Sequence, residues 1–475
     1  MFISMKIYPE FDCNASNHAL LLQYLTSNTH THSSDHKAGV MKKVTLIGAG
    51  SAVFAYEIMR DVLVTPGLET GTFALVDIDA ERLELAHQIA EKLIAITGRK
   101  WSVEASTDRT KVIAGTDYVI NSIEVAGLAN VRHDFDIPMK YGVNQCIGDT
   151  IGPGGIFKAL RTLPAWLEIL HDVERLAPGA LVMNFTNPMS LTCLAGIRAS
   201  SLPIIGLCHS IPHTAKTLAG YLDIPVGELR YRAAGINHLA WLVELTWQGQ
   251  DMYPRLRELA ALPEIYEKDP VRFEMMLHLG AFVTESSGHT SEYTPYFRKR
   301  PDLVEKYMRS GYLGETGYYA NNWPQWRERA AERVRQMLRG ELEPELKRGV
   351  EYASQIMEAI ESDTPAVVYG NVKNTGLITN LPDGGVVEVA CLVDRNGIQP
   401  TYFGSLPAQL AALDQQHMAV HDLVVTALLE KNREAAFHAL LLDPLTAAVC
   451  SPAEIRQMFD EMTAVEAADL PEWMN

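Results

Sequence analysis

Lys42-Lys43-Val44-Thr45-Leu46-Ile47-Gly48-Ala49-Gly50-Ser51 is the stretch that decides the fold of this chain. It begins with a short apolar run over residues 44–47, which predicts a buried strand, and Gly48-x-Gly50 predicts a tight turn that opens a helix. A second buried strand, over residues 72–77, follows this helix and ends in Asp77. The unit therefore has the strand–helix–strand order of a dinucleotide-binding fold.

This unit predicts an NAD site. Gly48 and Gly50 allow the close backbone approach that a pyrophosphate needs at the start of a helix. The Asp77 carboxylate would accept hydrogen bonds from a ribose 2′-hydroxyl and disfavour a 2′-phosphate, which favours NAD over NADP. The usual third glycine is absent, and Val53 stands in its place. The alternative is a glycine turn in an α/β protein that binds no dinucleotide.

Strands and helices continue to alternate beyond this unit. The sequence predicts an amphipathic helix over 80–97 and further strands over 117–122, 181–185 and 204–208. Such alternation implies an α/β fold with a mostly parallel, doubly wound sheet, whose ligands lie at the carboxyl ends of the strands. The residues expected at those ends are Gly48, Asp77, Asn121, Asn187 and Cys208.

The pattern changes beyond about residue 235. Long helices are expected over 330–339, 348–360 and 407–430, and strand-like runs at 366–369 and 386–390. We predict three parts: an N-terminal extension (1–40), a Rossmann-type NAD-binding domain (41–234) and an α+β catalytic and oligomerisation domain (235–475). The extension carries His30, His32 and His36 among polar residues without periodicity, and we interpret it as a poorly ordered tail.

Composition limits the classes of function. The chain has 475 residues, of which 47% are hydrophobic and 21% charged, as is ordinary for a soluble globular protein. Its net charge of -17 argues against a nucleic-acid-binding surface, which needs clustered Lys and Arg. No apolar run approaches the ~20 residues that span a bilayer. The six cysteines lack metal-finger spacing and suggest no disulfide framework, so a reducing cytoplasm is the simplest setting.

Cys208 and His238 form a candidate metal pair, because thiolate and imidazole suit Mn²⁺, Fe²⁺, Co²⁺, Ni²⁺ or Zn²⁺. Their spacing alone favours a buried cysteine and a core histidine. Residues 284–297 are polar, aromatic and interrupted by Gly and Pro, so we expect a loop; it could deliver a Tyr or Glu as an acid or base, although composition alone favours an ordinary loop. The glycines of residues 148–156, ahead of a helix expected at 157–163, suggest backbone amides aimed at a ligand.

Read together, these segments resemble glycoside hydrolase family 4, the NAD- and metal-dependent glycosidases. The resemblance runs in order from about Met41 almost to the C-terminus and is carried by Ile47-Gly48-Ala49-Gly50-Ser51, Val76-Asp77-Ile78-Asp79, Asp149-Thr150-Ile151-Gly152-Pro153-Gly154-Gly155, Asn187-Pro188, Cys208-His209-Ser210, Gly235-Ile236-Asn237-His238, Glu292-Tyr293-Thr294-Pro295, the run 374–382 and Gly397-Ile398-Gln399-Pro400. Residues 1–40 fall outside it.

The resemblance implies a fold like that of lactate and malate dehydrogenases and a mechanism unlike that of two-carboxylate glycosidases. NAD⁺ takes a hydride from C3 of the sugar, and the resulting ketone acidifies the C2 proton. A base removes this proton while a divalent metal, most simply Mn²⁺, stabilises the enediolate. The bond at C1 is then eliminated, water adds, and NADH returns the hydride.

The resemblance also assigns roles to residues. Cys208, as a thiolate, and His238 would hold the metal, and Tyr293 would be the base at C2. Asn187 would bind sugar hydroxyls. The residues that would hold NAD are Gly48, Gly50, Ser51 and Asp77. Asp149 is the candidate general acid, with His209 as the other candidate, because phosphoglycoside-cleaving members place an Asp where His209 stands.

His209 also bears on the substrate. Cys-His-Ser-Ile is similar to the Cys-His-Ser-Val of family α-galactosidases, so an uncharged α-galactoside is the expected substrate. The α-glucuronidases, α-galacturonidases and α-glucosidases of the family also carry a Cys-His pair, and Arg132, Arg232 or Arg298 could hold a uronate carboxylate. Family resemblance further implies a homodimer or homotetramer.

Two readings from other classes compete with a glycosidase. An NAD-dependent 2-hydroxy acid dehydrogenase of the lactate/malate type would explain the dinucleotide fold but needs no Cys208–His238 metal. A non-catalytic NAD-binding protein would bind the cofactor without turnover. The complete set of polar residues favours the glycosidase.

Overall fold

The computed structural model describes residues 41–474, without the side chains of residues 52 and 53. The prediction of a tail over residues 1–40 lies outside the described residues. Residues 41–475 form one compact unit by their internal contacts. Within the described part, no helix is long and apolar enough to cross a membrane.

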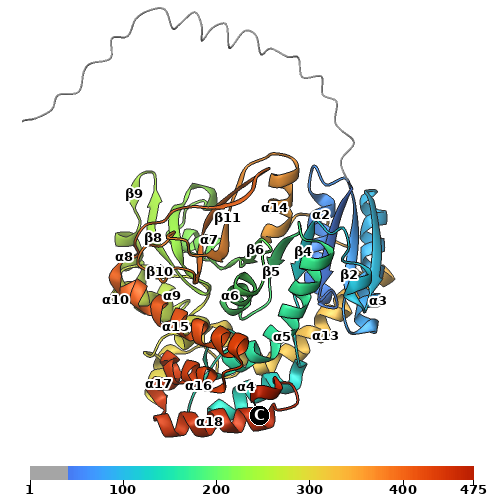
Figure 1. Ribbon diagram of the computed structural model, residues 1–475. Coiled ribbons are helices and arrows are strands. Elements are labelled where there is room, and N and C mark those ends of the chain that lie inside the picture. Colours follow the sequence, from blue (N-terminus) through green and yellow to red (C-terminus); the bar gives the residue numbers. More distant parts are fainter. Residues whose placement is uncertain (1–40, 475) are drawn as a thin grey trace, which may run out of the picture. The chain divides into compact units, whose positions relative to one another are not determined.

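One mixed sheet of 13 strands runs through this unit in the order β10-β8-β7-β12-β11-β6-β5-β4-β1-β2-β3, with β13 beside β12 and β9 beside β8 (Figure 1). The strands are β1 (Lys42–Ile47), β2 (Thr70–Val76), β3 (Lys100–Ser106), β4 (Tyr118–Asn121), β5 (Leu181–Asn184), β6 (Ile204–Leu207), β7 (Arg230–Ile236), β8 (Leu239–Trp247), β9 (Gln250–Asp251), β10 (Phe282–Val283), β11 (Ala366–Lys373), β12 (Val386–Asp394) and β13 (Gly397–Pro400).

The helices of the first half are α2 (Ala52–Val64), α3 (Ala80–Thr97), α4 (Gly127–Lys140), α5 (Gly152–Leu176), α6 (Met189–Ala199) and α7 (Ser210–Leu222). Those that follow are α8 (Tyr253–Ala260), α9 (Pro263–Tyr266), α10 (Pro270–Leu279), α11 (Ser287–Tyr293), α12 (Pro301–Tyr307), α13 (Tyr318–Arg339), α14 (Tyr352–Glu361), α15 (Ala408–Glu430), α16 (Arg433–Leu442), α17 (Pro444–Val449) and α18 (Pro452–Val465). Short 3₁₀ turns occupy Arg109–Lys111, Val226–Glu228, Gly311–Leu313 and Glu472–Met474.

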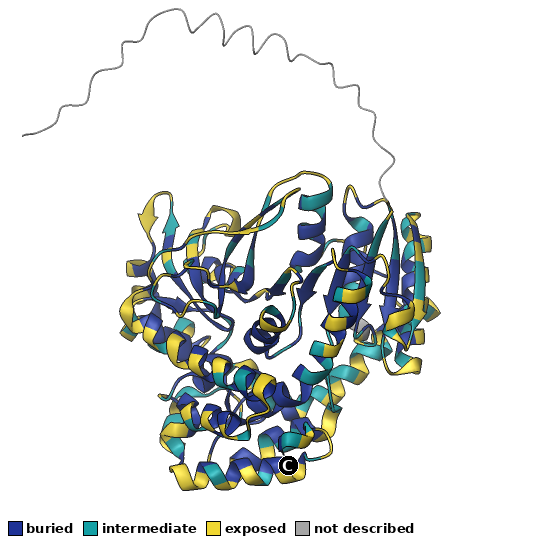
Figure 2. Cartoon of the chain, viewed as in Figure 1, coloured by how far each residue is buried: buried dark blue, intermediate teal, exposed yellow. Residues whose placement is uncertain are grey.

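The parallel half, β3-β2-β1-β4-β5-β6, has the strand order of the dinucleotide-binding fold, as the sequence predicts. Its central strands are buried on both faces (Figure 2), which explains their continuous apolar runs. The expected strand ends are confirmed: β1, β2 and β6 stop directly before Gly48, Asp77 and Cys208. Gly48 has φ +88°, and a Cβ there would lie 2.6 Å from the Ser122 carbonyl oxygen, so the first strand can only turn through glycine.

The antiparallel half continues the same sheet, because β11 pairs with β6 on one side and β12 on the other. The predicted change of pattern near residue 235 falls in β7, but the sheet does not break there; the division at 234/235 stays a prediction. Beyond the sheet, α15 packs on α5 and α6, and α16 and α17 also contact α5 (Figure 1). The C-terminal helices therefore support α5, the helix that begins beside the parallel strand ends.

Two local predictions are wrong. Residues 284–297 contain the buried helix α11 rather than only a loop; the Ser286 side chain caps it by accepting from the His289 amide. The sequence hides this helix because Gly288 and the polar residues lack apolar periodicity. The glycines of 152–155 lie inside α5, and the Gly155 amide donates to the Ile151 carbonyl, not toward a ligand. A Cβ on Gly155 would lie 2.5 Å from the carbonyl carbon of Thr150, so this glycine serves close packing.

Candidate active site

Cys208, His238 and Glu285 meet at the carboxyl edge of the sheet. Cys208 follows β6, His238 lies in the two-residue turn between β7 and β8, and Glu285 follows β10. One ligand atom from each, the Cys208 sulfur, an imidazole nitrogen and a carboxylate oxygen, lies within 4.8 Å of the other two. Three elements far apart in the chain therefore deliver a sulfur, a nitrogen and an oxygen donor to one point, a set that suits a divalent transition metal.

Backbone conformation supports a functional role for two of these residues. His238 has φ +62° and Glu285 has φ +74°, both in the left-handed region that glutamate and other side chains with a Cβ rarely adopt. Such conformations cost about 1–3 kcal/mol each and concentrate at functional sites. The strain aims both side chains at Cys208.

Burial and neighbouring charge set the protonation of the cluster. Burial lowers the pKa of His238 to about 4, so its imidazole is neutral and can act as a ligand. Burial alone would raise the pKa of Glu285, but the imidazoles around it, His238 first, lower it to about 2. Burial, and then the Glu285 carboxylate, raise the pKa of the Cys208 thiol well above its ordinary value. A bound cation would reverse this shift, because it stabilises the thiolate.

Tyr293 ends α11 beside this cluster. Its ring centroid lies 6.4 Å from that of His238 and 4.9 Å from that of His417, whose Nε2 lies 2.7 Å from the Tyr293 carbonyl oxygen. The Tyr293 side chain is buried, and burial followed by the charge of Asp149 raises the pKa of the phenol. A base at this position therefore needs a nearby positive charge.

Asp149 lies between the metal-ligand cluster and a buried lysine. Its carboxylate is close enough to act electrostatically on both His238 and Tyr293. On the other side, the Lys158 ammonium lies 3.6 Å from Asp149 and 3.0 Å from the carboxylate of Glu124. One Asp149 oxygen, Oδ1, is buried and has no hydrogen-bond partner within residues 41–474, so it remains available to a ligand.

His209 directly follows Cys208 but turns toward solvent. Its Nδ1 lies 3.3 Å from the Glu351 carboxylate, and 52% of its side chain is exposed. The hydrogen bond to Glu351, and to a lesser extent its charge, raise the pKa of His209. This residue therefore lies on the outer side of the cluster, where a substrate could reach it.

The residues predicted to hold NAD lie together at the same edge of the sheet. Asp77 accepts from the Gly50 amide at 2.7 Å and from the Asp79 amide at 2.9 Å, so its carboxylate lies against the glycine loop. A carboxylate offers about four acceptor positions, which leaves capacity for a ribose hydroxyl. The Ser51 side chain is exposed at the start of α2 and makes no capping bond. This arrangement fits a dinucleotide.

Several buried polar atoms around the cluster have no hydrogen-bond partner among the described residues: His238 Nδ1, Asn237 Nδ2, Asn187 Oδ1 and Asp149 Oδ1. Leaving such atoms unpaired costs about 1–3 kcal/mol each, so a polar ligand that pairs them would be bound favourably. A divalent cation and a hydroxyl-rich ligand together match this set of donors and acceptors. The residues present therefore fit the metal that the sequence predicts.

Sequence reasoning identified Cys208, His238, Tyr293, Asp149, Asn187 and His209, and the structure places them at this one edge. It did not single out Glu285, although the segment 284–297 was expected to deliver a Tyr or Glu. It also missed Lys158, which has no sequence signal because a lysine on a helix usually faces solvent.

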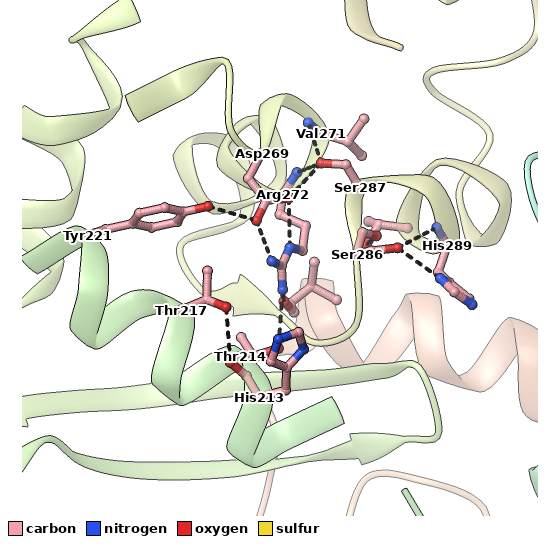
Figure 3. Close-up of polar contacts among 12 residues, drawn as sticks. His213, Thr214, Thr217, Tyr221, Asp269, Val271, Arg272, Ser286, Ser287 and His289 are labelled. Atoms are coloured by element: carbon pink, nitrogen blue, oxygen red, sulfur yellow. Dashed lines mark hydrogen bonds and ion pairs between the residues drawn. The ribbon is translucent and has the colours of Figure 1, made fainter. Parts of the chain in front are cut away.

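A polar network holds the segment that carries Glu285 (Figure 3). Arg272 forms an ion pair with Asp269, and Asp269 accepts from the Ser287 hydroxyl at 2.7 Å. Ser286 Oγ lies 2.8 Å from His289 Nδ1, and the His289 ring lies 4.9 Å from that of His238. The first turn of α11 is therefore fixed to α10, directly beside the metal-ligand cluster.

Comparison with known proteins gives a consistent result. Residues 43–224 match the model described as family 4 glycosyl hydrolase, and residues 233–446 match the C-terminal domain of the same family. An α-galactosidase of Bacillus subtilis (strain 168) is 39% identical over 439 residues, which cover 91% of this chain and 100% of that protein.

Two solved structures have the same fold. The crystal structure of lplD, a proposed glucosidase of Bacillus subtilis, superposes with a TM-score of 0.80 at 26% identity and covers 89% of this chain and 99% of its own. A 6-phospho-α-glucosidase from gut microorganisms, solved in complex with NAD and Mn²⁺, superposes with a TM-score of 0.77 at 22% identity over 91% of this chain and 99% of its own.

Proposed function

The chain belongs to family 4 of the glycosyl hydrolases, and on this premise we propose that it hydrolyses α-galactosides with NAD⁺ and a divalent cation, Mn²⁺ first, as cofactors. The observation that carries the proposal is the meeting of Cys208, His238 and Glu285 beside Tyr293, at the sheet edge that also holds the glycine loop. The 39% identity to an α-galactosidase over that protein's full length supports the choice of substrate.

The cofactors have distinct tasks in this proposal. When bound, NAD⁺ supplies reversible hydride acceptance from a sugar carbon, and the cation supplies Lewis-acid polarisation of the sugar oxygens. Cys208, His238 and Glu285 hold the cation, with Cys208 as a thiolate. Asp77 would orient the ribose beside the glycine loop, because its carboxylate already accepts a hydrogen bond from the Gly50 amide there.

Acid–base work falls to residues on either side of the cluster. Tyr293 would take the proton from the sugar carbon next to the one that gives the hydride, and a cation held by Cys208, His238 and Glu285 would make its phenol basic enough. Asp149, in its protonated form, gives a proton to the glycosidic oxygen, and Lys158 orients the Asp149 carboxyl group. Asn187 binds a sugar hydroxyl through its unpartnered Oδ1.

The surroundings of three arginines favour an uncharged sugar over a uronate. Arg298 is buried and donates to Ser291, Asn144 and the Gly314 carbonyl. Arg132 pairs with Asp136, and Arg232 pairs with Glu244. Since each guanidinium is already engaged, none of the three is a ready partner for a substrate carboxylate.

A panel of p-nitrophenyl glycosides tests the proposal. It contains the α-galactoside, α-glucoside, α-glucuronide, α-galacturonide and 6-phospho-glucosides, each assayed with NAD⁺, Mn²⁺ and a thiol reductant and then with each component omitted. We expect release from the α-galactoside only with all three present and without net NADH. Chelation of the metal should abolish release, and added Mn²⁺ should restore it. The Cys208→Ser variant should require far more Mn²⁺.

Each alternative gives a different result. If the enzyme prefers a uronide or an α-glucoside, the proposed mechanism stands and the proposed α-galactoside substrate is wrong. Accumulation of NADH on 2-hydroxy acids, without glycoside cleavage, would instead identify a dehydrogenase. NAD binding with no turnover at all would indicate a non-catalytic protein.

The proposal includes a setting and an assembly state. Five cysteines of the described part are free thiols, and the Cys208 ligand must stay reduced, which suits the cytoplasm. We expect a homodimer or homotetramer, as the family resemblance implies. Light scattering of the purified protein would measure the assembly, and a monomer at working concentration would contradict it.

A further inference from the structure

Glu292 is a buried carboxylate that binds a backbone loop instead of a cation. Its Oε1 accepts from the Cys146 and Ile147 amides at 2.5 Å each, and its Oε2 accepts from the Gly148 amide at 3.0 Å. Only 2% of the residue is exposed. Three successive amides that converge on one carboxylate form a strong, directional contact, because hydrogen bonds to an ionised acceptor are shorter and stronger than neutral ones.

This contact joins the two sides of the acid–base machinery. Glu292 directly precedes Tyr293 in α11, and Gly148 directly precedes Asp149 in the loop. On its other side the loop packs closely against α5: a Cβ on Gly154 would lie 2.3 Å from the Gly148 carbonyl oxygen. The Cys146 carbonyl also accepts from the Tyr319 amide at 3.0 Å, so α13 holds the carbonyl side of the loop and Glu292 holds its amides.

The start of α11 is held independently of its end. Ser287 is fixed to Asp269 by the network described above (Figure 3), whereas Glu292 reaches the 146–148 loop from the last turn of the helix. The helix should therefore keep its place when Glu292 is substituted, because its first turn stays bonded to Asp269, whereas the loop would lose three hydrogen bonds. Substitution of Glu292 should consequently alter the spacing between Asp149 and Tyr293 more than the fold.

We propose that Glu292 is a positioning residue that sets the distance between the Asp149 carboxylate and the Tyr293 phenol. The inference rests on the proposed function, because it assumes that these two groups act on opposite ends of one sugar. It assigns no proton transfer to Glu292. The Glu292 carboxylate accepts the three backbone hydrogen bonds, while Tyr293 and Asp149 contact the substrate.

Glu292→Gln and Glu292→Asp test the proposal. A Gln side chain keeps the size but has one acceptor oxygen, and its amide group would face a backbone N–H. We expect kcat to fall by about 10–100-fold with KM within about threefold, because small misplacements of reacting groups cost this much. Glu292→Asp keeps the charge on a shorter stem and should recover part of kcat.

Asp61→Asn is the matched control. Asp61 is also a buried carboxylate that accepts a backbone amide, from Gly349 at 2.9 Å, but it lies in α2 and pairs with Arg60. Its substitution should lower the melting temperature without changing kcat. Mn²⁺ and NAD⁺ affinities should be unchanged in the Glu292 variants.

Amide hydrogen exchange gives a readout that needs no substrate. In the native protein the amides of residues 146–148 should be protected, and Glu292→Gln should remove this protection locally, whereas Asp61→Asn should not. Unprotected amides in the native protein would overturn the proposal. This test needs only the native protein, so it remains decisive if the Glu292→Gln variant fails to fold. A kcat for Glu292→Gln equal to that of Asp61→Asn, or a parallel loss of Mn²⁺ affinity, would overturn it as well. If the native protein cleaves no glycoside, the proposed function fails, and exchange still decides whether Glu292 holds the loop.

Discussion

Two buried cations lie three residues apart on α5, and each is flanked by two carboxylates. Arg161 contacts Asp134 and Glu466, and Lys158 contacts Glu124 and Asp149. The two clusters have the same formal charges and share one helix, yet they differ in geometry. The difference separates a cluster that holds the fold from one that serves the site.

The Arg161 cluster is closed. Its guanidinium donates to both oxygens of Asp134, at 3.0 and 2.6 Å, and also to Glu466. It thereby joins α5 to α4 and to the end of α18. Burial, and then the charge of Asp134, raise the pKa of Glu466 to about 8, so this cluster retains a proton at neutral pH. Arg161 Nε and Glu466 Oε1 have no hydrogen-bond partner among the described residues, but at most 1% of either side chain is exposed, so no ligand reaches them unless the structure opens.

The Lys158 cluster is open. Lysine is a point charge without the fixed fork of arginine, and its distance to Asp149 is 3.6 Å, longer than a close hydrogen bond. Burial opposes its charge, but the carboxylates of Glu124 and Asp149 outweigh burial and raise the pKa of Lys158. Lys158 therefore orients the Asp149 carboxylate through Oδ2 and leaves Oδ1 without a hydrogen-bond partner in the described part of the chain.

Loss of the closed cluster should have the largest effect. Arg161→Met leaves the buried carboxyl groups of Asp134 and Glu466 without their cation and should lower the free energy of unfolding by about 3–5 kcal/mol. Denaturant titration measures this loss. The folded fraction should retain native kcat, because Arg161 does not contact the site. A fall in kcat together with unchanged stability would reverse the assignment of the two clusters.

Asp149→Asn should be next in size and should depend on the leaving group. Removal of a general acid costs about 10²–10³-fold, or about 3–4 kcal/mol, when the leaving group needs a proton. We therefore expect this loss with methyl α-galactoside and a much smaller one with p-nitrophenyl α-galactoside. Equal losses on the two substrates would exclude Asp149 as the acid and leave His209 as the candidate.

Lys158→Met should affect catalysis more than stability. Without the ammonium, the Asp149 carboxylate loses its orientation, and kcat should fall by about 30–100-fold, or about 2–3 kcal/mol. The loss of unfolding free energy should be smaller than for Arg161→Met, because 24% of the Glu124 side chain is exposed to solvent. Denaturant titration measures the loss of unfolding free energy of Lys158→Met, and steady-state kinetics measures its loss of kcat. Equal destabilisation by the two substitutions would remove the distinction between the clusters.

The pH dependence of stability should show the smallest effect. Because the pKa of Glu466 is raised from 4.5 to about 8, its protonated form stabilises the fold at low pH. This contribution is lost as pH rises from about 4.5 through about 8. Glu466→Gln stays neutral, so between pH 7 and 8.5 its unfolding free energy should fall less than that of the native protein, by about 1 kcal/mol. Parallel curves for the two proteins would show that Glu466 does not titrate in this range.

Much of the site could be predicted from local sequence. Gly48, Asp77 and Cys208 end predicted strands, and parallel strand ends share one edge, so their proximity followed from the pattern. Glu285 and Glu292 could not be found in this way. Both belong to a polar segment without periodicity, and their roles depend on residues more than 45 positions away in the chain.

The doubly wound parallel sheet, the glycine loop and the family could be predicted from the sequence alone, because hydrophobic periodicity and local turn chemistry act over a few residues. The folded structure is needed to tell which carboxylates are closed off from solvent and which can reach a ligand. Those properties depend on burial and on charges brought together from distant elements, as Lys158 and Arg161 show on one helix. The same residue types therefore hold the fold at one turn of α5 and serve the site at the preceding turn.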